Sequence, residues 1–213
     1  MGIEHGIGTT HMAVMTAMEL SKIENKKVAL VEINNSNNMK DLGEWISGQR
    51  LESNNYPLGN VDVYFGMDYL TFTAMYKDNY DYIVIDFGCY NKKRQAMQEF
   101  IRIPSKYVIA SGIDWNLPTL ADFYDDFSVD VTHSVVYLIP YLEGDLLTPI
   151  ERLVKPNKVL TIPFNINPFS IEPETQKLLE TIINKNNNNG PVLLEDKQFV
   201  ATQKHGFFAK IRK

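Results

Sequence analysis

Short apolar segments alternate with amphipathic segments along most of the chain. The runs 27–33 and 81–87 are apolar and rich in β-branched residues, which is typical of strands buried on both faces. Shorter apolar runs predict four further strands, at 61–65, 107–110, 135–139 and 159–162. Apolar residues at helical spacing predict helices between these strands, at 9–25, 41–46, 69–76, 94–103, 117–127, 145–154 and 173–183. This alternation predicts an α/β fold with a doubly wound, mostly parallel sheet flanked by helices.

The predicted topology brings several loops to one edge of the sheet. In sheets of this class, ligands bind beyond the carboxyl ends of the strands. We therefore expect the loops 2–8, 34–38, 88–92 and 163–168 to share one rim. The alternation stops after Asn186, so we expect a domain over 1–185 and a linker with a tail over 186–213, where a β hairpin is one possible structure.

Composition narrows the class of protein. Of the 213 residues, 44% are hydrophobic and 22% are charged, and the net charge is −5, as in an ordinary soluble domain. The negative balance argues against a nucleic-acid partner, and no sequence-specific nucleic-acid binding is expected. The single cysteine, Cys89, excludes an intramolecular disulfide and fits a reducing, cytoplasmic location. No apolar run is long enough to span a bilayer.

The segment Gly6-Ile7-Gly8-Thr9-Thr10 lies where the first helix is predicted to begin. Glycines let successive backbone N–H groups point at one anion, and the helix dipole adds to the attraction. A threonine in the first helical turn supplies a hydroxyl that suits magnesium. A plain helix start, with a threonine as its cap, explains the same residues without any ligand.

The order of these parts resembles a known family. A glycine loop and helix are followed by a strand ending in Glu32 and later by a strand ending in Asp86. This order resembles the ParA/MinD branch of P-loop ATPases and its CpaE/TadZ relatives, which help to place pili and secretion machines. The resemblance covers about residues 2–185. It implies a P-loop fold with ATP and magnesium as cofactors, and the metal beside Thr10 and Asp86.

The same resemblance extends the expected nucleotide site. The segment 162–165 is similar to the strand end that lies near the nucleotide base in this family, so Pro163 and Phe164 are expected to join the loop residues in binding. Asp86 has a simpler reading as well, because strand-end carboxylates commonly cap the next turn.

Three departures from the family pattern weaken the expected activity. Thr9 stands in the position of the loop lysine, and Glu4 stands in the position of the additional signature lysine. Asn34 replaces the second carboxylate, and no lysine or arginine precedes Lys22. Phosphoryl transfer depends on cations that neutralise developing charge, so we expect weakened ATP binding and little or no hydrolysis, with no residue assigned as catalytic. The expected role is a localisation or assembly factor that contacts other proteins and forms a homodimer across the rim.

Two alternatives remain open at this stage. An active ATPase could use a lysine from another loop or subunit, for which Lys92 and Lys93 are the nearest candidates. A Rossmann-type dinucleotide site would use Gly6, Gly8 and Glu32, although its third glycine falls at His11.

The two ends of the chain raise separate questions. Only Met1, Gly2 and Ile3 precede the glycine loop, so the first strand is expected to be missing or truncated. Either Met1 is internal to a longer natural chain, which we expect because a missing middle strand would expose two buried edges, or the fold lacks its central strand. The segment 206–213 combines apolar and basic residues, as do the membrane-targeting helices of MinD-type proteins. It is short, and its pattern fits an edge strand equally well, so membrane contact is not expected.

Overall fold

Parallel strands with helical crossovers make up the observed structure, as the sequence pattern predicts. The computed structural model describes residues 1–23, 25–34, 36–67, 69–90, 96–112, 116–128 and 135–187. The strands of this part are β1 (Val28–Glu32), β2 (Asn55–Leu58), β3 (Val61–Tyr64), β4 (Tyr82–Asp86), β5 (Lys106–Ile109), β6 (Val135–Pro140) and β7 (Lys158–Ile162). They form two sheets, of order β2-β3-β1-β4 and β5-β6-β7. All pairs are parallel except β2 with β3.

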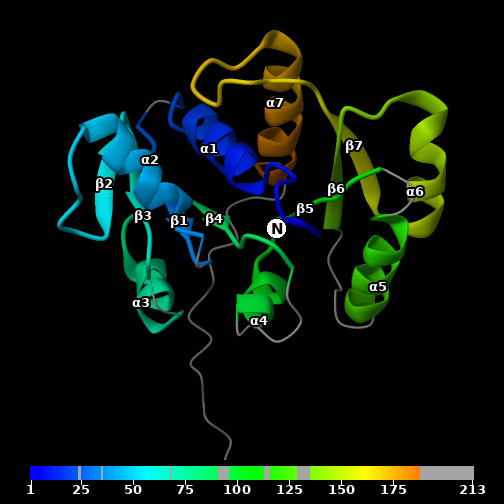
Figure 1. Cartoon of the computed structure of the whole chain (residues 1–213), viewed down its shortest axis with the longest axis horizontal. Helices are drawn as coiled ribbons and strands as arrows, with labels where there is room; N and C mark the ends of the chain where they lie inside the picture. The colour runs from blue at the N-terminus through cyan, green and yellow to red at the C-terminus, as the bar shows by residue number, and fades with distance from the viewer. Residues whose placement is uncertain are drawn as a thin grey trace, which may run out of the picture.

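The helices cover both faces of these sheets. They are α1 (Thr9–Leu20), α2 (Asn38–Ser47), α3 (Tyr69–Ala74), α4 (Ala96–Arg102), α5 (Leu117–Ser128), α6 (Thr148–Leu153) and α7 (Pro173–Asn187). Figure 1 shows α1 and α7 on one side of the strands and α3, α4 and α5 on the other. The buried clusters agree, because α1 and α7 share apolar contacts with β5–β7, whereas α4 and α5 pack with other side chains of the same strands. The predicted doubly wound architecture is confirmed.

Residues 1–3 join the two sheets. Gly2 forms bridges to Cys89, just after β4, and to Ile109 at the end of β5, and both bridges are parallel. The Gly2 N–H donates to the carbonyl of Gly88 at 2.9 Å, and the Ile109 N–H donates to the carbonyl of Met1 at 2.8 Å. The continuous strand order is therefore β2-β3-β1-β4, residues 1–3, then β5-β6-β7. A short segment thus occupies the central position where the sequence predicts a missing or truncated strand.

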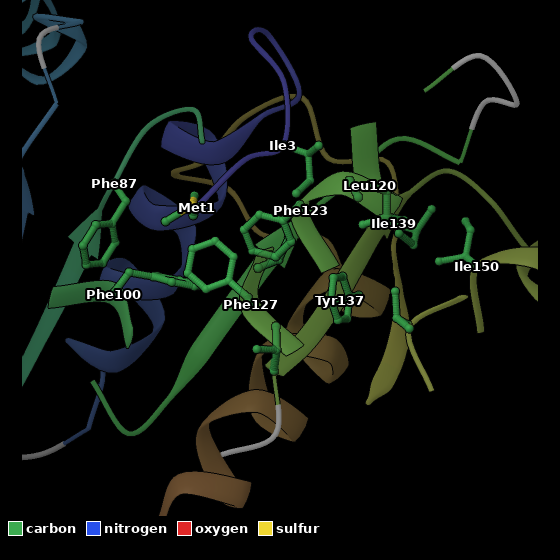
Figure 2. Packing of buried hydrophobic residues seen from close by; sticks show 14 of the residues in the cluster. Met1, Ile3, Phe87, Phe100, Leu120, Phe123, Phe127, Tyr137, Ile139 and Ile150 are labelled. Atoms are coloured by element: carbon green, nitrogen blue, oxygen red, sulfur yellow. The ribbon is translucent and has the colours of Figure 1, made fainter. Parts of the chain in front are cut away.

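This central segment is also part of the largest apolar cluster. Met1 and Ile3 are buried, and Figure 2 shows them among aromatic side chains from several elements. Phe123 and Phe127 of α5 stack with ring centroids 4.6 Å apart, and Phe87 meets Phe100 edge to face at 5.3 Å. The packing explains why three residues hold a central position: their side chains and both backbone edges are buried together.

Some predicted boundaries differ from the structure. The edge strand β2 was not predicted, because its pattern is polar and it contains Pro57, which is tolerated only where a strand edge needs no donor. The predicted helix over 145–154 is divided into a short 3-10 turn, Gly144–Leu147, and α6. The predicted helix over 69–76 likewise ends in a 3-10 turn, Met75–Lys77.

Residues 188–213 lie outside the described residues, so the linker, the hairpin and the basic tail that are expected over 186–213 stay predictions. Within the described ranges, no helix has both the length and the apolar character needed to cross a membrane.

Candidate functional site

The glycine loop connects the central segment to α1. Gly6 has a φ of +77° and Gly8 a φ of +92°, a left-handed backbone that favours glycine. The first helical hydrogen bond runs from the Met12 N–H to the Gly8 carbonyl. The backbone N–H groups of Gly6 and of residues 8–11 donate no hydrogen bond to any residue that the structure describes. A loop with free amides at a helix N-terminus is chemically suited to bind an anion.

Thr10 and Asp86 lie side by side next to this loop. The Thr10 hydroxyl donates to Asp86 Oδ2 at 2.7 Å, and it accepts a hydrogen bond from Asn38 Nδ2 at 3.1 Å. Asp86 is fully buried at the end of β4, and its Oδ1 accepts from the Gly88 N–H at 2.8 Å. A hydroxyl beside a carboxylate fits the oxygen preference of magnesium, which commonly takes its remaining ligands from phosphate and water.

The end of β1 adds a second carboxylate to this region. Glu32 pairs in register with Asp86 on the neighbouring strand. Its Oε1 accepts from the Ser36 hydroxyl at 2.6 Å and from the Met39 N–H at 3.4 Å, so Glu32 holds the start of α2. Burial raises the pKa of the Glu32 carboxyl above its ordinary value, an effect that these hydrogen bonds partly offset and that the nearby Asp86 carboxyl increases.

Asn34 is engaged within the protein. Its Nδ2 donates to the backbone carbonyl of Asp86 at 3.2 Å, and its Oδ1 accepts from the Ser36 N–H at 2.8 Å. It also lies against Gly88, where a β-carbon would come within 2.8 Å of the Asn34 side chain. These contacts tie the ends of β1 and β4 together, so the amide at this position has a structural use.

The residues at the two lysine positions point to neighbouring parts of the protein. A β-carbon added to Gly2 would lie 2.3 Å from the Thr9 hydroxyl oxygen, so the Thr9 side chain packs against the central segment. Glu4 accepts a hydrogen bond from Asn116 Nδ2 at 3.0 Å, just before α5. Neither position supplies a positive charge to the loop.

The loop after β7 lies beside α1, as the rim prediction requires. His11 Nε2 lies 2.8 Å from the carbonyl oxygen of Asn165. Phe164 is 65% exposed, and its ring centroid is 5.7 Å from that of Tyr141. The segment with Pro163 therefore reaches the rim on the α1 side.

Several contacts of the site were not predicted from the sequence. Asn38, Asn116 and Tyr141 are brought to the rim by tertiary packing, and each carries a common polar or aromatic side chain without a recognisable spacing. Lys92 and Lys93 lie outside the described residues. No cluster of three or more potential metal-binding His, Cys, Asp or Glu side chains occurs among the residues with described positions.

Several solved structures have a fold similar to that of this chain. No protein-family profile and no curated protein matches the sequence. The cell-division ATPase MinD of Pyrococcus furiosus superposes with a TM-score of 0.61 at 16% identity, over 86% of this chain and 97% of that chain. Aquifex aeolicus MinD gives 0.60 at 13%, over 85% and 92%. An ATP complex of a variant of Cyanothece McdA gives 0.58 at 12%, also over 85% and 92%. This chain therefore has the P-loop-type α/β fold of the MinD and ParA ATPases.

Proposed function

We propose that this chain is a degenerate ParA/MinD-like P-loop protein that binds nucleotide weakly, hydrolyses ATP slowly or not at all, and acts as a localisation or assembly factor. One observation carries the proposal. The loop keeps its free amides and the Thr10–Asp86 pair, while Thr9 and Glu4 occupy the two positions where the family has lysine.

The chemistry of phosphoryl transfer explains the expected loss of activity. Little covalent work falls to the protein in this reaction, so positioning and charge neutralisation supply most of the catalysis. Removing one dedicated electrostatic contact costs about 10²- to 10³-fold in rate. Two cations are absent here, and Glu4 adds a negative charge close to the loop.

Weak nucleotide binding is the part of the family function that the loop still supports. The amides of Gly6 and of residues 8–11 would hold phosphate oxygens, and Thr10 with Asp86 would hold a phosphate-bound magnesium ion. Pro163 and Phe164 would lie against the base. The Cyanothece relative is solved as an ATP complex, which supports ATP as the first nucleotide to test.

The active-ATPase alternative depends on a lysine from elsewhere. Lys92 and Lys93 follow the β4 loop in sequence and remain the nearest candidates in the chain. If purified protein hydrolyses ATP, Lys92→Ala with Lys93→Ala should abolish turnover under this alternative. An unchanged rate of ATP hydrolysis would exclude this alternative.

The dinucleotide alternative is less well supported. In a Rossmann sheet the strand before the glycine loop lies next to the strand that follows the first helix. Here β4 separates residues 1–3 from β1, and Glu32, the expected ribose ligand, holds α2 instead. This arrangement favours the P-loop interpretation.

Action through protein contacts is proposed by comparison with the structural relatives. Aquifex aeolicus MinD is solved in a complex with MinC, another cell-division protein. For this chain we propose protein partners of the same general kind, with a homodimer across the glycine-loop rim and a role at the cell pole or in a pilus or secretion machine. Measuring the molecular mass in solution with and without ATP tests whether the chain forms this homodimer.

Calorimetric titration with ATP and magnesium tests the proposed function. We expect weak binding that falls further in Thr10→Val, because that variant lacks the hydroxyl offered to magnesium. Thr16→Val, on the same helix but bonded back to the Met12 carbonyl, is the matched control and should bind as the wild type does. Micromolar binding accompanied by turnover would overturn the proposal.

A further inference from the structure

Large apolar side chains are exposed on two neighbouring loops beyond β6 and β7. Tyr141 is 67% exposed and Phe164 is 65% exposed, and their rings contact each other. The loops are joined by the Tyr141 N–H, which donates to the Ile162 carbonyl at 3.1 Å. We call this exposed pair, Tyr141 and Phe164, the rim patch. Exposed apolar groups gathered in this way mark an interaction surface.

The two loops that carry the rim patch contain negative charges only. The segments 141–147 and 163–172 contain Glu143, Asp145 and Glu172, and no lysine or arginine. All three carboxyl residues are exposed. A second copy of the same patch would bring like charges together. A segment that is both apolar and basic would match the exposed rings and carry the opposite charge.

A second exposed apolar group, on α2, has charges of both signs nearby. Trp45 and Ile46 project from the end of α2, with Lys40 and Glu44 on the same helix and Arg50 just beyond it. Because both signs of charge are present there, that surface does not select a basic segment. Charge complementarity therefore distinguishes the rim patch from the α2 surface.

The chain itself contains a segment with the complementary composition. Residues 204–213 carry four basic residues, Lys204, Lys210, Arg212 and Lys213, and no acidic residue. They also include Phe207, Phe208 and Ile211. We propose that residues 204–213 dock on the rim patch of their own chain, with these apolar side chains against Tyr141 and Phe164.

The length of the intervening chain permits this contact. Helix α7 starts near the rim and has 15 residues, so its end lies about 22 Å away along the helix axis. Residues 188–203 number 16 and extend to about 53 Å when stretched, which is enough to return to the rim. A tethered segment also has a high effective concentration at its site, commonly millimolar, which favours docking within the chain over docking of a free partner.

Phe164 is also proposed to lie against the base, so the docking is tested without nucleotide, which keeps the outcome separate from that of the proposed function.

Cysteine cross-linking in the full chain tests the contact. In a Cys89→Ser background, Ala209→Cys is combined either with Leu146→Cys, on the loop that carries Tyr141, Glu143 and Asp145, or with Trp45→Cys on α2, and a short bis-maleimide is added. Trp45 is a fair control because it is even more exposed, at 80%, than Leu146 at 65%. We expect intramolecular cross-linking of the Leu146→Cys pair to be about tenfold faster, given the gain in local concentration on docking.

Charge reversal makes the test specific. Lys210→Glu with Arg212→Glu should reduce the rate to that of the control pair, and adding Glu143→Lys with Asp145→Lys should restore it. Equal cross-linking rates for the two cysteine pairs would overturn the proposal. A cross-linking rate that the charge reversals leave unchanged would also overturn it. Predominantly intermolecular cross-links at low protein concentration would also overturn it, because they would identify a second copy as the occupant.

Discussion

Thr10 and Asp86, 76 residues apart in the sequence, are joined by a 2.7 Å hydrogen bond from the Thr10 hydroxyl to Asp86 Oδ2. The bond links the start of α1 to the end of β4 and fixes the place where the glycine loop meets the sheet. It holds the pair in position beside a loop that carries no lysine or arginine. The pair therefore contributes to the stability of the fold.

Removal of the Thr10 hydroxyl should destabilise the protein. Thr10→Val leaves Asp86 Oδ2 buried without this donor, so we expect the free energy of unfolding to fall by about 1–3 kcal/mol. Urea unfolding followed by circular dichroism measures the change. Thr16→Val removes a hydroxyl that bonds to its own helix, so it should cost less, and equal losses in the two variants would contradict this role of Thr10.

The contact between Gly2 and Thr9 predicts coupling between the two positions. A methyl group at Gly2 would lie 2.3 Å from Thr9 Oγ1, so Gly2→Ala should cost about 1–3 kcal/mol through overpacking. In a Thr9→Ala background the cost should be smaller by about 0.5 kcal/mol or more, since the clashing oxygen is gone. A double-mutant cycle from urea unfolding measures this coupling.

Gly48 provides the control for this cycle. It has a φ of +68°, and a β-carbon there would meet nothing within 4 Å, so only backbone strain is added. Gly48→Ala should lose the same stability in both backgrounds. A coupling for Gly48 as large as that for Gly2 would show that the Gly2–Thr9 contact is not its source.

The sequence predicted β1 and β6 because almost all of their residues are buried. Such strands appear in the sequence as short apolar runs, and in β1 only the last residue, Glu32, is charged. The central segment could not be recognised in this way, because three residues are too few to show a period. Its role depends on hydrogen bonds to Gly88 and Ile109, which only the folded chain brings together.

The site was predictable to a similar extent. The loop glycines, Thr10 and Asp86 follow a recognisable order, and the fold places them together. The use of Asn34 and Glu32 as structural links was not predictable, because it depends on hydrogen bonds from Ser36 and Met39 to Glu32 and from Asn34 to Asp86, which only the folded chain brings together. The same residue types would serve equally well as ligands in another loop conformation.

Glu32 should make the stability depend on pH. Burial raises the pKa of its carboxyl in the folded state, so the folded chain holds this proton more tightly than the unfolded chain does. The Glu32 contribution therefore lowers stability as pH rises from the unfolded pKa through the raised folded pKa, and it has no effect below both. Glu32→Gln, which cannot ionise, should gain stability relative to the wild type as the pH rises above about 4, the unfolded pKa of a glutamate.

Urea midpoints at several pH values measure this difference. Glu151→Gln, at an exposed position on α6, controls for the loss of one negative charge. The Glu32 account would be wrong if the stability of Glu32→Gln relative to the wild type stayed constant or declined across this pH range.

Restoring the loop lysine should strengthen nucleotide binding. Thr9→Lys adds a charge-assisted contact to phosphate of about 1.5–3 kcal/mol, which corresponds to roughly 10- to 100-fold tighter binding of ATP. Thr9→Met, similar in length and uncharged, is the control, and calorimetry gives both affinities. Equal affinities for the lysine and methionine variants would show that phosphate does not occupy this loop.

The charge of Glu4 should act in the same direction. Glu4→Gln removes a negative charge beside the loop while keeping a side-chain oxygen for Asn116. We expect tighter ATP binding that is most evident at low ionic strength, because salt screens such interactions. An affinity that is unchanged at low salt would mean that Glu4 does not influence the bound anion.

The central claim is that this chain binds nucleotide weakly and hydrolyses ATP slowly or not at all. Release of phosphate from ATP tests this claim most directly. The purified chain is assayed with excess ATP and magnesium beside Thr10→Val, which lacks the hydroxyl needed at the metal. We predict that the wild-type chain releases phosphate no faster than this variant. Sustained turnover of the wild-type chain that disappears in Thr10→Val would contradict the claim and identify the protein as an active ATPase.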